Sequence, residues 1–519
     1  MPVRSPSSLL GATFAVTAAL LGAAAAQGVQ GGTPAPAGAS VLTIALAGDP
    51  GLLDPAQSGN YVDRNVFASL CDKLIDTDAE MNLVPQLATS WEWSEDRLAL
   101  TIHLRDGVQF QDGTRLDAEA VRRNLERSRT MPKSLRRAEL APITAVEVVD
   151  PLTVRVRLSA PYAPLLAVLA DRSGMMLSPK AIEEQGEAMA QRPVCAGPYT
   201  LTERVAQDRI VVDRFPGYWN AAAVTIGRIV YRPIPDTTVR LLNLQSGQLQ
   251  IADQLAPNDV AAVQANPRLR VARHVAAAYR IMQFNTAHGP RADTPLGRDP
   301  RVRRALDLAI DRAAINQVVF DGLFVPSNQT EAPGSRYWNP ALPVKGADLA
   351  AAKALLREAG VDRVRFTLSL STSPIDAQIG EVIQAMGREA GFDITLQQIE
   401  SNAGNQQNLA GEFDAALLTW SGRADPDANA SIWLNCAGPF NFGRYCNPRM
   451  ESLLSEARAL SEPDARAALY RQVAELARTD MPQITLYHYT WLWGMSDRVD
   501  GFVPNIDGLI RPQGLRLRP

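Results

Sequence analysis

The sequence predicts an α/β protein with more than one hydrophobic core. From Ser90 to Leu104, apolar residues recur at every second position within two short runs, which is the period of half-buried antiparallel strands. Further along, Val364 to Leu370 alternates as a strand, Ile379 to Ala390 reads as a helix, and Ile394 to Ile399 reads as a strand again. Strand–helix–strand order of this kind is typical of an α/β unit. The chain has 519 residues, which is more than a single core ordinarily serves.

Turn and cap residues divide the first of these regions into elements. The polar segment Ser94 to Arg97 separates the two apolar runs and predicts a hairpin loop. Asp117 precedes apolar residues spaced by one helical turn, so we expect it to cap a helix. A second hairpin is expected over Thr144 to Leu158, turning at Asp150-Pro151.

Composition and motifs argue against two classes of function. The net charge is −3, so the chain lacks the basic balance of a nucleic-acid-binding protein. The sequence contains no G-x-S-x-G, Walker, G-x-G-x-x-G or H-E-x-x-H motif. The four histidines are scattered, at positions 103, 274, 288 and 488, and no CxxC is present, which disfavours a metal site. We therefore expect neither catalysis nor a cofactor. A secreted hydrolase is the alternative from another class, and it would need a nucleophile or metal constellation.

The N-terminal residues 1–26 are interpreted as a cleavable signal peptide. Arg4 supplies the positive start, Leu9 to Leu21 the apolar stretch, and Ala24 to Ala26 the small-residue cleavage site. Residues 27–40 are rich in Gly, Pro and Ala and predict a flexible tether. These features predict export of the mature chain. An uncleaved membrane anchor is the alternative.

Export makes disulfide bonds possible for the four cysteines. Four cysteines allow three pairings. Cys436 and Cys446 lie in one short loop-like segment and pair most economically, which leaves Cys71 with Cys195. Buried free thiols are the alternative.

Several motifs, in order along the chain, resemble one family. Ser90 to Val121 contains a Trp-bearing strand, a Ser-x-Asp turn and an LRxGVxFxDG run. CAGPYTL from Cys195, RFPGYW from Arg214 and DPRVRRALDLAIDR from Asp299 follow it. Together they resemble the family 5 extracellular solute-binding proteins, the peptide, nickel and oligopeptide class that feeds ABC importers, from about Val41 to the C-terminus. That family usually has Gly-Thr where Cys195-Ala196 stands here, which favours a disulfide at Cys195.

The resemblance implies an α/β, two-lobe periplasmic-binding-protein fold of type II, similar to the large cluster C. An extra subdomain would belong to the first lobe, and two strand crossings near Ile281 to Thr286 and Ile484 to Tyr489 would form the hinge. The implied boundaries are 41–282 for the first lobe with the subdomain at about 85–190, 283–486 for the second lobe, and 487–519 for a return to the first. The resemblance also implies a monomer in the periplasm that binds a small peptide or peptide-like solute and delivers it to the permease subunits of an ABC transporter in the inner membrane.

The best candidate for ligand binding is the segment TWSGRADPD, which begins at Thr419. Loops at the carboxyl ends of strands in an α/β unit face the ligand crevice. The dipeptide-binding branch of the family has an Asp here that pairs with the peptide's amino terminus, whereas this chain has Arg423 at the aligned position. Because an arginine fork favours a carboxylate or phosphate, we expect an anionic solute. Alternatively, Arg423 pairs with Asp425 or Asp427 as a structural bridge.

The remaining candidates for ligand contact are weaker. Trp420 would stack on the ligand or fill the core, and Asp425 belongs to the same loop. Tyr61 and Arg137 (or its neighbour Arg136) are placed near the cavity by the family resemblance alone. Within the family, a nickel or metal-chelate binder is the alternative function, because a chelator can supply most of the metal ligands.

Overall fold

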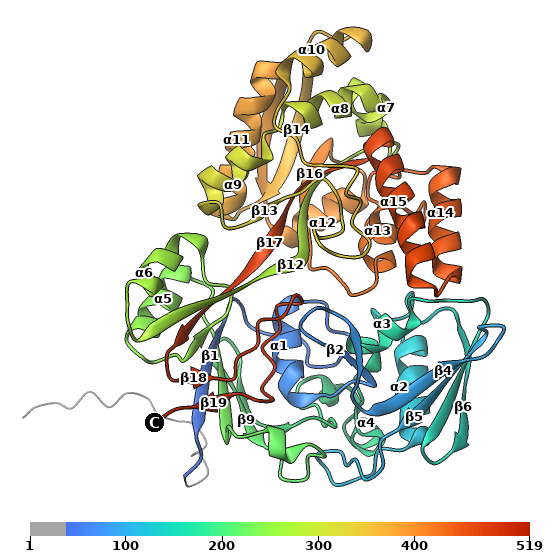
Figure 1. Ribbon diagram of the computed structural model, residues 1–519, viewed down its shortest axis with the longest axis vertical. Coiled ribbons are helices and arrows are strands. Elements are labelled where there is room, and N and C mark those ends of the chain that lie inside the picture. Colours follow the sequence, from blue (N-terminus) through green and yellow to red (C-terminus); the bar gives the residue numbers. More distant parts are fainter. Residues whose placement is uncertain (1–37) are drawn as a thin grey trace, which may run out of the picture. The chain divides into compact units, whose positions relative to one another are not determined.

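The computed structural model describes residues 38–519 (Figure 1). The expected signal peptide at 1–26 and most of the expected tether at 27–40 lie outside the described residues. Among the residues that are described, no helix is both long enough and apolar enough to span a membrane.

One large mixed sheet runs through the described chain, with two long antiparallel strands at its centre, β12 (Leu269–Phe284) and β17 (Gln483–Ser496). On the β17 side follow β11 (Ile251–Ala252), β1 (Val41–Leu46), β10 (Arg228–Pro233), β9 (Arg209–Arg214) and β8 (Tyr199–Val205). On the β12 side follow β16 (Ala415–Trp420), β14 (Val364–Ser371) and β15 (Phe392–Ile399), while β13 (Val325–Pro326) pairs with β17. The central position of β12 and β17 is visible in Figure 1.

The two central strands each contribute to two separate hydrophobic cores. In β12, Ala276 and Ala278 belong to a first core, which also holds β1 and β10, whereas Met282 and Phe284 belong to a second. In β17 the order is reversed, because Ile484, Leu486 and Tyr487 pack in the second core, whereas Trp491, Trp493 and Met495 pack in the first. The chain therefore has more than one core, as its length predicts, and the two cores share a pair of strands. The exact lobe boundaries stay a prediction.

A four-stranded antiparallel sheet forms the region of the hairpins predicted from sequence. Its strands, in the order β4, β5, β7 and β6, are Ala88–Trp93, Ala99–Leu104, Thr153–Leu158 and Ile143–Asp150. Both predicted hairpins are confirmed by this pairing. The Asp117 side chain accepts a hydrogen bond of 2.9 Å from the Ala120 amide, which confirms the predicted cap of α2 (Ala118–Thr130). One face of the sheet and α2 enclose a third core.

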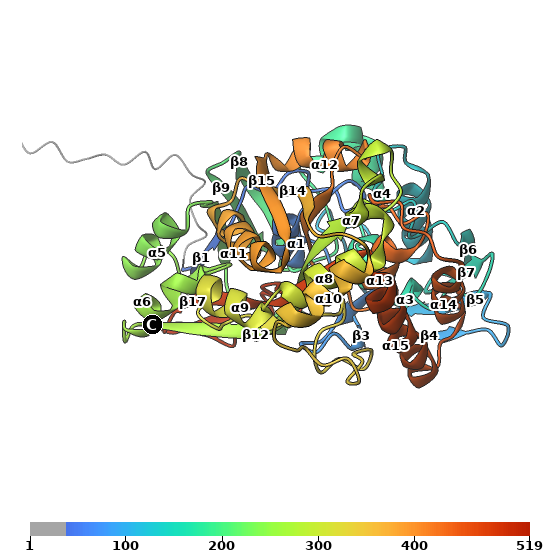
Figure 2. The ribbon, with the colours of Figure 1, turned by 90° about the horizontal axis from the view of Figure 1, so that it is seen from above.

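The predicted strand–helix–strand unit is also present. The strand β14 leads into α11 (Pro374–Ala390), which Gly391 caps, and the chain returns as β15, parallel to β14. Nearby, α14 (Pro448–Ala459) and α15 (Pro463–Asp480) lie side by side in both views (Figures 1 and 2).

The other helices and short strands connect these parts. The helices are α1 (Tyr61–Leu70), α3 (Leu165–Leu169), α4 (Pro179–Gln185), α5 (Thr237–Gln245), α6 (Val260–Gln264), α7 (Pro295–Arg298), α8 (Pro300–Ala309), α9 (Arg312–Phe320), α10 (Leu349–Glu358), α12 (Ser401–Leu409) and α13 (Asp427–Leu434). The short strand pairs are β2 (Ile75–Thr77) with β3 (Leu83–Pro85) and β18 (Val499–Asp500) with β19 (Arg516–Leu517).

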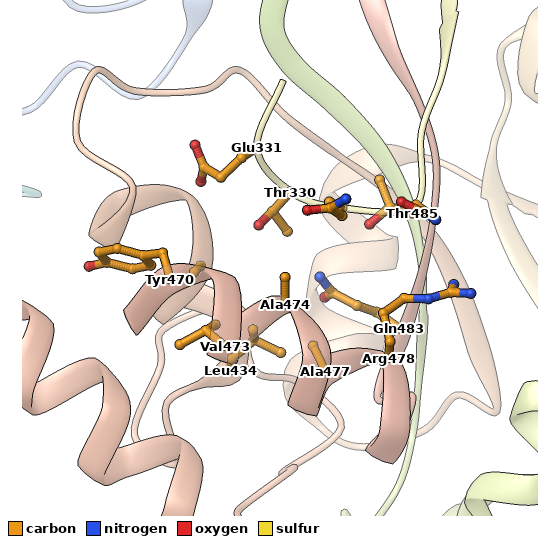
Figure 3. A pocket seen from close by; sticks show the side chains of 13 residues that line it. Thr330, Glu331, Leu434, Tyr470, Val473, Ala474, Ala477, Arg478, Gln483 and Thr485 are labelled. Carbon is orange, nitrogen blue, oxygen red and sulfur yellow. The ribbon is translucent and has the colours of Figure 1, made fainter. Parts of the chain in front are cut away.

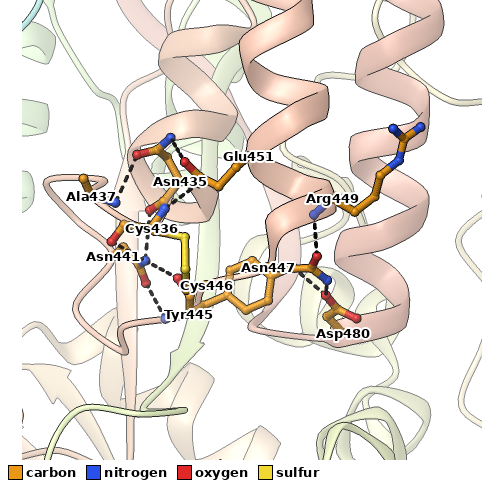
Figure 4. The surroundings of a disulfide bond; sticks show 10 residues. All are labelled: Asn435, Cys436, Ala437, Asn441, Tyr445, Cys446, Asn447, Arg449, Glu451 and Asp480. Carbon is orange, nitrogen blue, oxygen red and sulfur yellow. Dashed lines mark hydrogen bonds between the residues drawn. A yellow bond between two sulfur atoms is a disulfide. The ribbon is translucent and has the colours of Figure 1, made fainter.

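Two disulfides join the cysteines in the pairs expected from sequence, Cys71–Cys195 and Cys436–Cys446. The second closes the loop between α13 and α14 (Figure 4). The loop is further held by the Cys436 amide, which donates to Glu451 Oε1 at 2.7 Å, and by Asn441 Nδ2, which donates to the Tyr445 carbonyl at 2.6 Å. The hydrogen bonds and the covalent link together fix the end of α13, and so support the loop that precedes that helix.

Candidate functional site

The loop between β16 and α13 is held rigidly by one asparagine. Asn429 Oδ1 accepts hydrogen bonds from Trp420 Nε1 at 3.1 Å and from the Arg423 amide at 2.8 Å. Asn429 Nδ2 donates to the Arg423 carbonyl at 3.0 Å. Gly422 has φ of +72°, and a Cβ there would lie 2.5 Å from atoms of Ala277, so only glycine fits this turn without displacement. The loop therefore presents the Arg423 side chain in one position.

Arg423 pairs with an acid that sequence reasoning missed. Its Nε lies 3.1 Å from Asp171 Oδ2, and its guanidinium lies over the Trp420 ring, 4.7 Å from the ring centre. Arg423 Nη1 donates to Ser421 Oγ at 2.8 Å and to the Gly422 carbonyl at 2.6 Å. The contact with Asp171 joins the loop after β16 to the end of α3, two segments that lie far apart in the sequence.

The alternative prediction, that Arg423 bridges to Asp425 or Asp427, is wrong. Asp425 pairs with Arg466 at 2.7 and 2.9 Å, using both carboxylate oxygens. Asp427 Oδ1 accepts from Arg458 at 2.9 Å. These acids therefore anchor the loop to α15 and α14, and the structure commits Asp425, a predicted ligand contact, to that anchoring.

Asp171 stands at the centre of several guanidinium groups. Besides Arg423, it lies 3.2 Å from Arg64 Nε on α1 and 3.8 Å from Arg172 Nη1. Burial alone would raise the pKa of the Asp171 carboxyl, but the surrounding guanidinium groups outweigh it, Arg64 most strongly, and hold that pKa well below its usual range. A Cβ at Gly174 would lie 1.7 Å from the Leu169 carbonyl oxygen, so the turn after α3 packs tightly and fixes Asp171.

Two further side chains complete the group. Arg136 Nη1 lies 3.4 Å from Glu139 Oε1, and the same oxygen accepts from Ser173 Oγ at 2.5 Å. Arg172 donates to Ser58 Oγ at 3.2 Å and to the Asn60 carbonyl at 2.5 Å. We call Arg64, Arg136, Arg172 and Arg423, with Asp171 and Glu139, the arginine cluster. The loop from Leu52 to Tyr61 contacts the cluster through Ser58 and Asn60.

The arginine cluster carries more positive charge than negative charge, since four guanidinium groups face two carboxylates. Burial, which Asp171 only partly offsets, and the neighbouring arginines lower the pKa of Arg172 to about 9. Arg64 Nε faces Asp171, whereas Arg64 Nη1 and Arg136 Nε are buried and have no hydrogen-bond partner within residues 38–519. Unpaired buried donors are costly, so the arrangement suits an added group that accepts hydrogen bonds and carries negative charge.

The other predicted contact residues lie in different settings. The Tyr61 hydroxyl donates to the Gly508 carbonyl at 2.6 Å, and its ring stacks on Trp491 at 4.8 Å between centres. Trp420 packs edge-on against Trp433, while its face carries Arg423. Arg137 is exposed and lines a shallow surface hollow together with Arg129, Ser134, Leu135, Ala138 and Ala141. The structure therefore brings Trp420 and Arg423 together and does not join Arg137 to them.

A small internal cavity lies beside this region, between α13, α15 and β17 (Figure 3). Its volume is about 30 Å³, which is room for water molecules and not for a peptide. Figure 3 shows Glu331 and Thr330 on one side, facing Tyr470, Val473 and Ala474 from α15. Burial raises the pKa of Glu331 to about 8, so this carboxyl is largely neutral at pH 7. In the part of the chain that the structure describes, no group of three or more His, Cys, Asp or Glu side chains is arranged to hold a metal ion.

Comparison with known proteins decides the family. Residues 82–441 match the model of the bacterial extracellular solute-binding proteins, family 5 (middle region). The chain belongs to this family. It is therefore a solute-binding protein of the class that serves ABC importers, as the motifs predicted. Family 5 proteins act outside the cytoplasm, in agreement with the predicted export.

Similar proteins agree with this assignment along most of the chain. The glutathione-binding protein GsiB of Salmonella paratyphi A is 29% identical over 475 residues, covering 89% of this chain and 91% of the relative. GsiB of Escherichia coli O1:K1 / APEC is 28% identical over 485 residues, covering 89% and 92%.

Solved structures confirm the two-lobe α/β fold. The periplasmic binding protein DppA of Helicobacter pylori, in complex with the peptide STSA, has a TM-score of 0.80 at 24% identity and covers 92% of this chain and 98% of its own. HbpA2 of Haemophilus parasuis has a TM-score of 0.79 at 25% identity and covers 92% and 100%.

Proposed function

We propose that this family 5 protein captures a small, peptide-like solute that carries at least one carboxylate, and delivers it to the permease of an ABC importer. The observation that carries the proposal is the surplus of buried guanidinium groups in the arginine cluster. A ligand carboxylate would supply the missing acceptors and negative charge. The relatives named as glutathione-binding proteins support this ligand class, since glutathione is a small peptide with two carboxylates.

Capture would use motion between the two lobes. We place the first lobe at 41–282, with an extra subdomain at about 85–190, the second lobe at 283–486, and the return at 487–519. The paired strands β12 and β17, which enter both cores, would form the hinge. Binding then shifts the protein from an open to a closed state without making a bond, so we propose that the chain is not an enzyme.

The setting follows from the same proposal. The protein would act as a monomer in the periplasm after removal of residues 1–26, with the permease subunits as its partner and without nucleic acid. Solute bound in the closed form would be released to the permease, where the ATP-dependent steps occur.

Isothermal titration calorimetry tests the proposed ligand class. Glutathione, the peptide Ser-Thr-Ser-Ala and their derivatives without carboxylates would be titrated into the purified protein. Binding of at least one carboxylate-bearing peptide, with loss of binding when its carboxylates are neutralised, is the expected result. Equal binding of charged and neutralised forms would contradict the proposal.

A further inference from the structure

The positions of the charges in the arginine cluster indicate which end of the solute the cluster binds, which its net positive charge alone does not. Each acid in the cluster is already committed to arginine. Asp171 is shared by Arg64, Arg172 and Arg423, and Glu139 lies between Arg136 and Ser173. A positively charged amino group that approached either carboxylate would meet these guanidinium groups at close range.

The acids on the neighbouring loop are committed as well. Asp425 is held through both oxygens by Arg466, and Asp427 by Arg458. Both carboxylates are buried, so solvent does little to screen their interactions. Asp425 and Asp427, the two acids that anchor the loop presenting Arg423, therefore already have cationic partners.

Hydrogen-bond donors in the arginine cluster, in contrast, outnumber the acceptors that they contact. The side chain of Arg64 is only 6% exposed, and its Nε faces Asp171 at 3.2 Å. Its Nη1 has no hydrogen-bond partner among the residues of the described chain. Arg136 Nε is in the same state. These nitrogens belong to a cluster whose members are fixed by α1, by the turn after α3 and by the Asn429-bound loop. The site is thus built in advance to receive hydrogen-bond acceptors.

We infer that the arginine cluster takes the carboxylate end of its solute and makes no use of a free amino group, so that N-acylated peptides belong to its ligand class. This inference rests on the proposed function, because it specifies which end of a captured solute is read. In a site with a carboxylate at the position of Arg423, that carboxylate would hold the amino terminus of the solute. Here the opposite, carboxylate-bearing end of the solute would be bound.

The test compares matched derivatives of two peptides by calorimetry on the purified protein. Glutathione would be compared with its N-acetyl derivative and its diethyl ester, and Ser-Thr-Ser-Ala with its N-acetyl and C-terminal amide forms. For the peptide that binds, we expect N-acetylation to change Kd less than about fivefold and removal of the carboxylate charge to raise Kd at least about 30-fold. An N-acetyl form weakened as much as the ester or amide would overturn the inference.

The outcomes separate the inference from the proposed function. If neither free peptide nor any of the derivatives binds, the proposed ligand class fails and the inference fails with it. If the free peptides bind and N-acetylation abolishes binding, the inference alone fails. This series uses the unaltered protein, so it does not depend on any variant folding.

A variant identifies the residue that reads the carboxylate. Arg64→Met should weaken binding of the free and N-acetylated peptide by the same factor, at least about tenfold, with no further effect on the ester or amide. Arg64→Lys keeps the charge and should restore part of the affinity. A loss confined to the free peptide would place Arg64 near the amino group and contradict the inference.

Discussion

At the scale of single residues, Arg423 is distinguished by the partners that surround it. Its guanidinium is held by Ser421, Gly422 and Asp171 and lies over Trp420. A side chain fixed in this way loses little conformational freedom when a ligand binds, which favours affinity. Arg423 therefore combines two roles, because it is part of the loop's structure and also a donor for a ligand.

Arg423→Ala should weaken binding of the carboxylate-bearing solute by about 2–5 kcal/mol, roughly 30-fold or more. The reason is that the ligand loses a charged hydrogen-bond donor while Asp171 keeps its other arginines. Calorimetry measures the change. Arg363→Ala is a matched control, since Arg363 forms an exposed pair with Asp393 at 2.7 Å and should leave Kd unchanged. Equal affinities of the Arg423 variant and the control would contradict the role of Arg423.

Asp72 predicts a pH dependence of stability. Burial raises the pKa of its carboxyl to about 7, although hydrogen bonds from Trp219 and Tyr218 oppose the rise. An unfolded aspartate titrates near 3.9, so the folded state binds a proton that the unfolded state has lost. The free energy of unfolding should therefore fall as pH rises from about 4 to about 7. Above pH 7 the contribution of Asp72 should no longer change with pH.

Asp72→Asn should remove this component, because an amide does not titrate. Between pH 6 and 7 the unaltered protein should lose about 1 kcal/mol more than the variant. Urea unfolding at the two pH values measures the difference. Burial also raises the pKa of Asp253 to about 7. Because Asp253 is present in both proteins, only the difference between their pH profiles reports on Asp72. Parallel pH profiles of the two proteins would rule out the assignment.

At the scale of elements, the β16–α13 loop depends on a close approach to β12. Gly422→Ala should weaken solute binding at least about tenfold, equivalent to about 1.4 kcal/mol, because a Cβ 2.5 Å from Ala277 displaces the loop that carries Arg423. Calorimetry on the folded variant measures the loss. Gly334→Ala has a comparable φ of +89° but open space around the added atom, so it should bind normally. If the Gly422 variant binds as tightly as the Gly334 variant, the contact with Ala277 does not position the loop.

Local elements could be predicted from sequence because their signals are local. The β4–β5 hairpin follows from alternation and the polar Ser94–Arg97 segment, and the Asp117 cap from one side chain and one amide. The segment that contains Arg423 does follow a strand, β16, as expected, and its role in ligand binding stays a prediction. The partner of Arg423 could not be predicted, since Asp171 becomes its neighbour only after α3 and β16 are assembled.

Arg136 is the one further arginine of the cluster that the family resemblance names, as the neighbour of Arg137. Arg64 and Arg172 escaped prediction for the same reason as Asp171. Arg64 lies in α1 within a sequence that reads as an ordinary helix, and Arg172 follows a short helix by three residues. Neither position has a motif around it. An arginine in a segment that is otherwise expected to be buried is a usable signal, because a buried charge requires partners or a function, but it does not say which partners.

At the scale of the whole molecule, the proposed hinge predicts a change of dimensions. A saturating solute should lower the radius of gyration measured by small-angle X-ray scattering, because hinge closure brings the lobes together. The same solute at 100 times its Kd should stabilise the fold by about 2.7 kcal/mol, observable as a higher Tm. The diethyl ester of glutathione serves as the control and should produce neither effect. Calorimetric binding without any change in the radius of gyration would contradict hinge closure.

The position of β17 also bears on when this protein can fold. The strand lies between β12 and β11 at the middle of the large sheet, yet it begins at Gln483, near the end of the chain. Trp493 and Met495 of β17 fill the first core beside β1. The large sheet contains β1, the first strand of the described chain, but it is complete only once β17 has been added. A chain emerging from its N-terminus must therefore wait for its final segment, and contacts so distant in sequence form slowly. Truncation of the last few dozen residues should remove β17, one of the two strands that both cores share, and expose the whole chain to proteolysis.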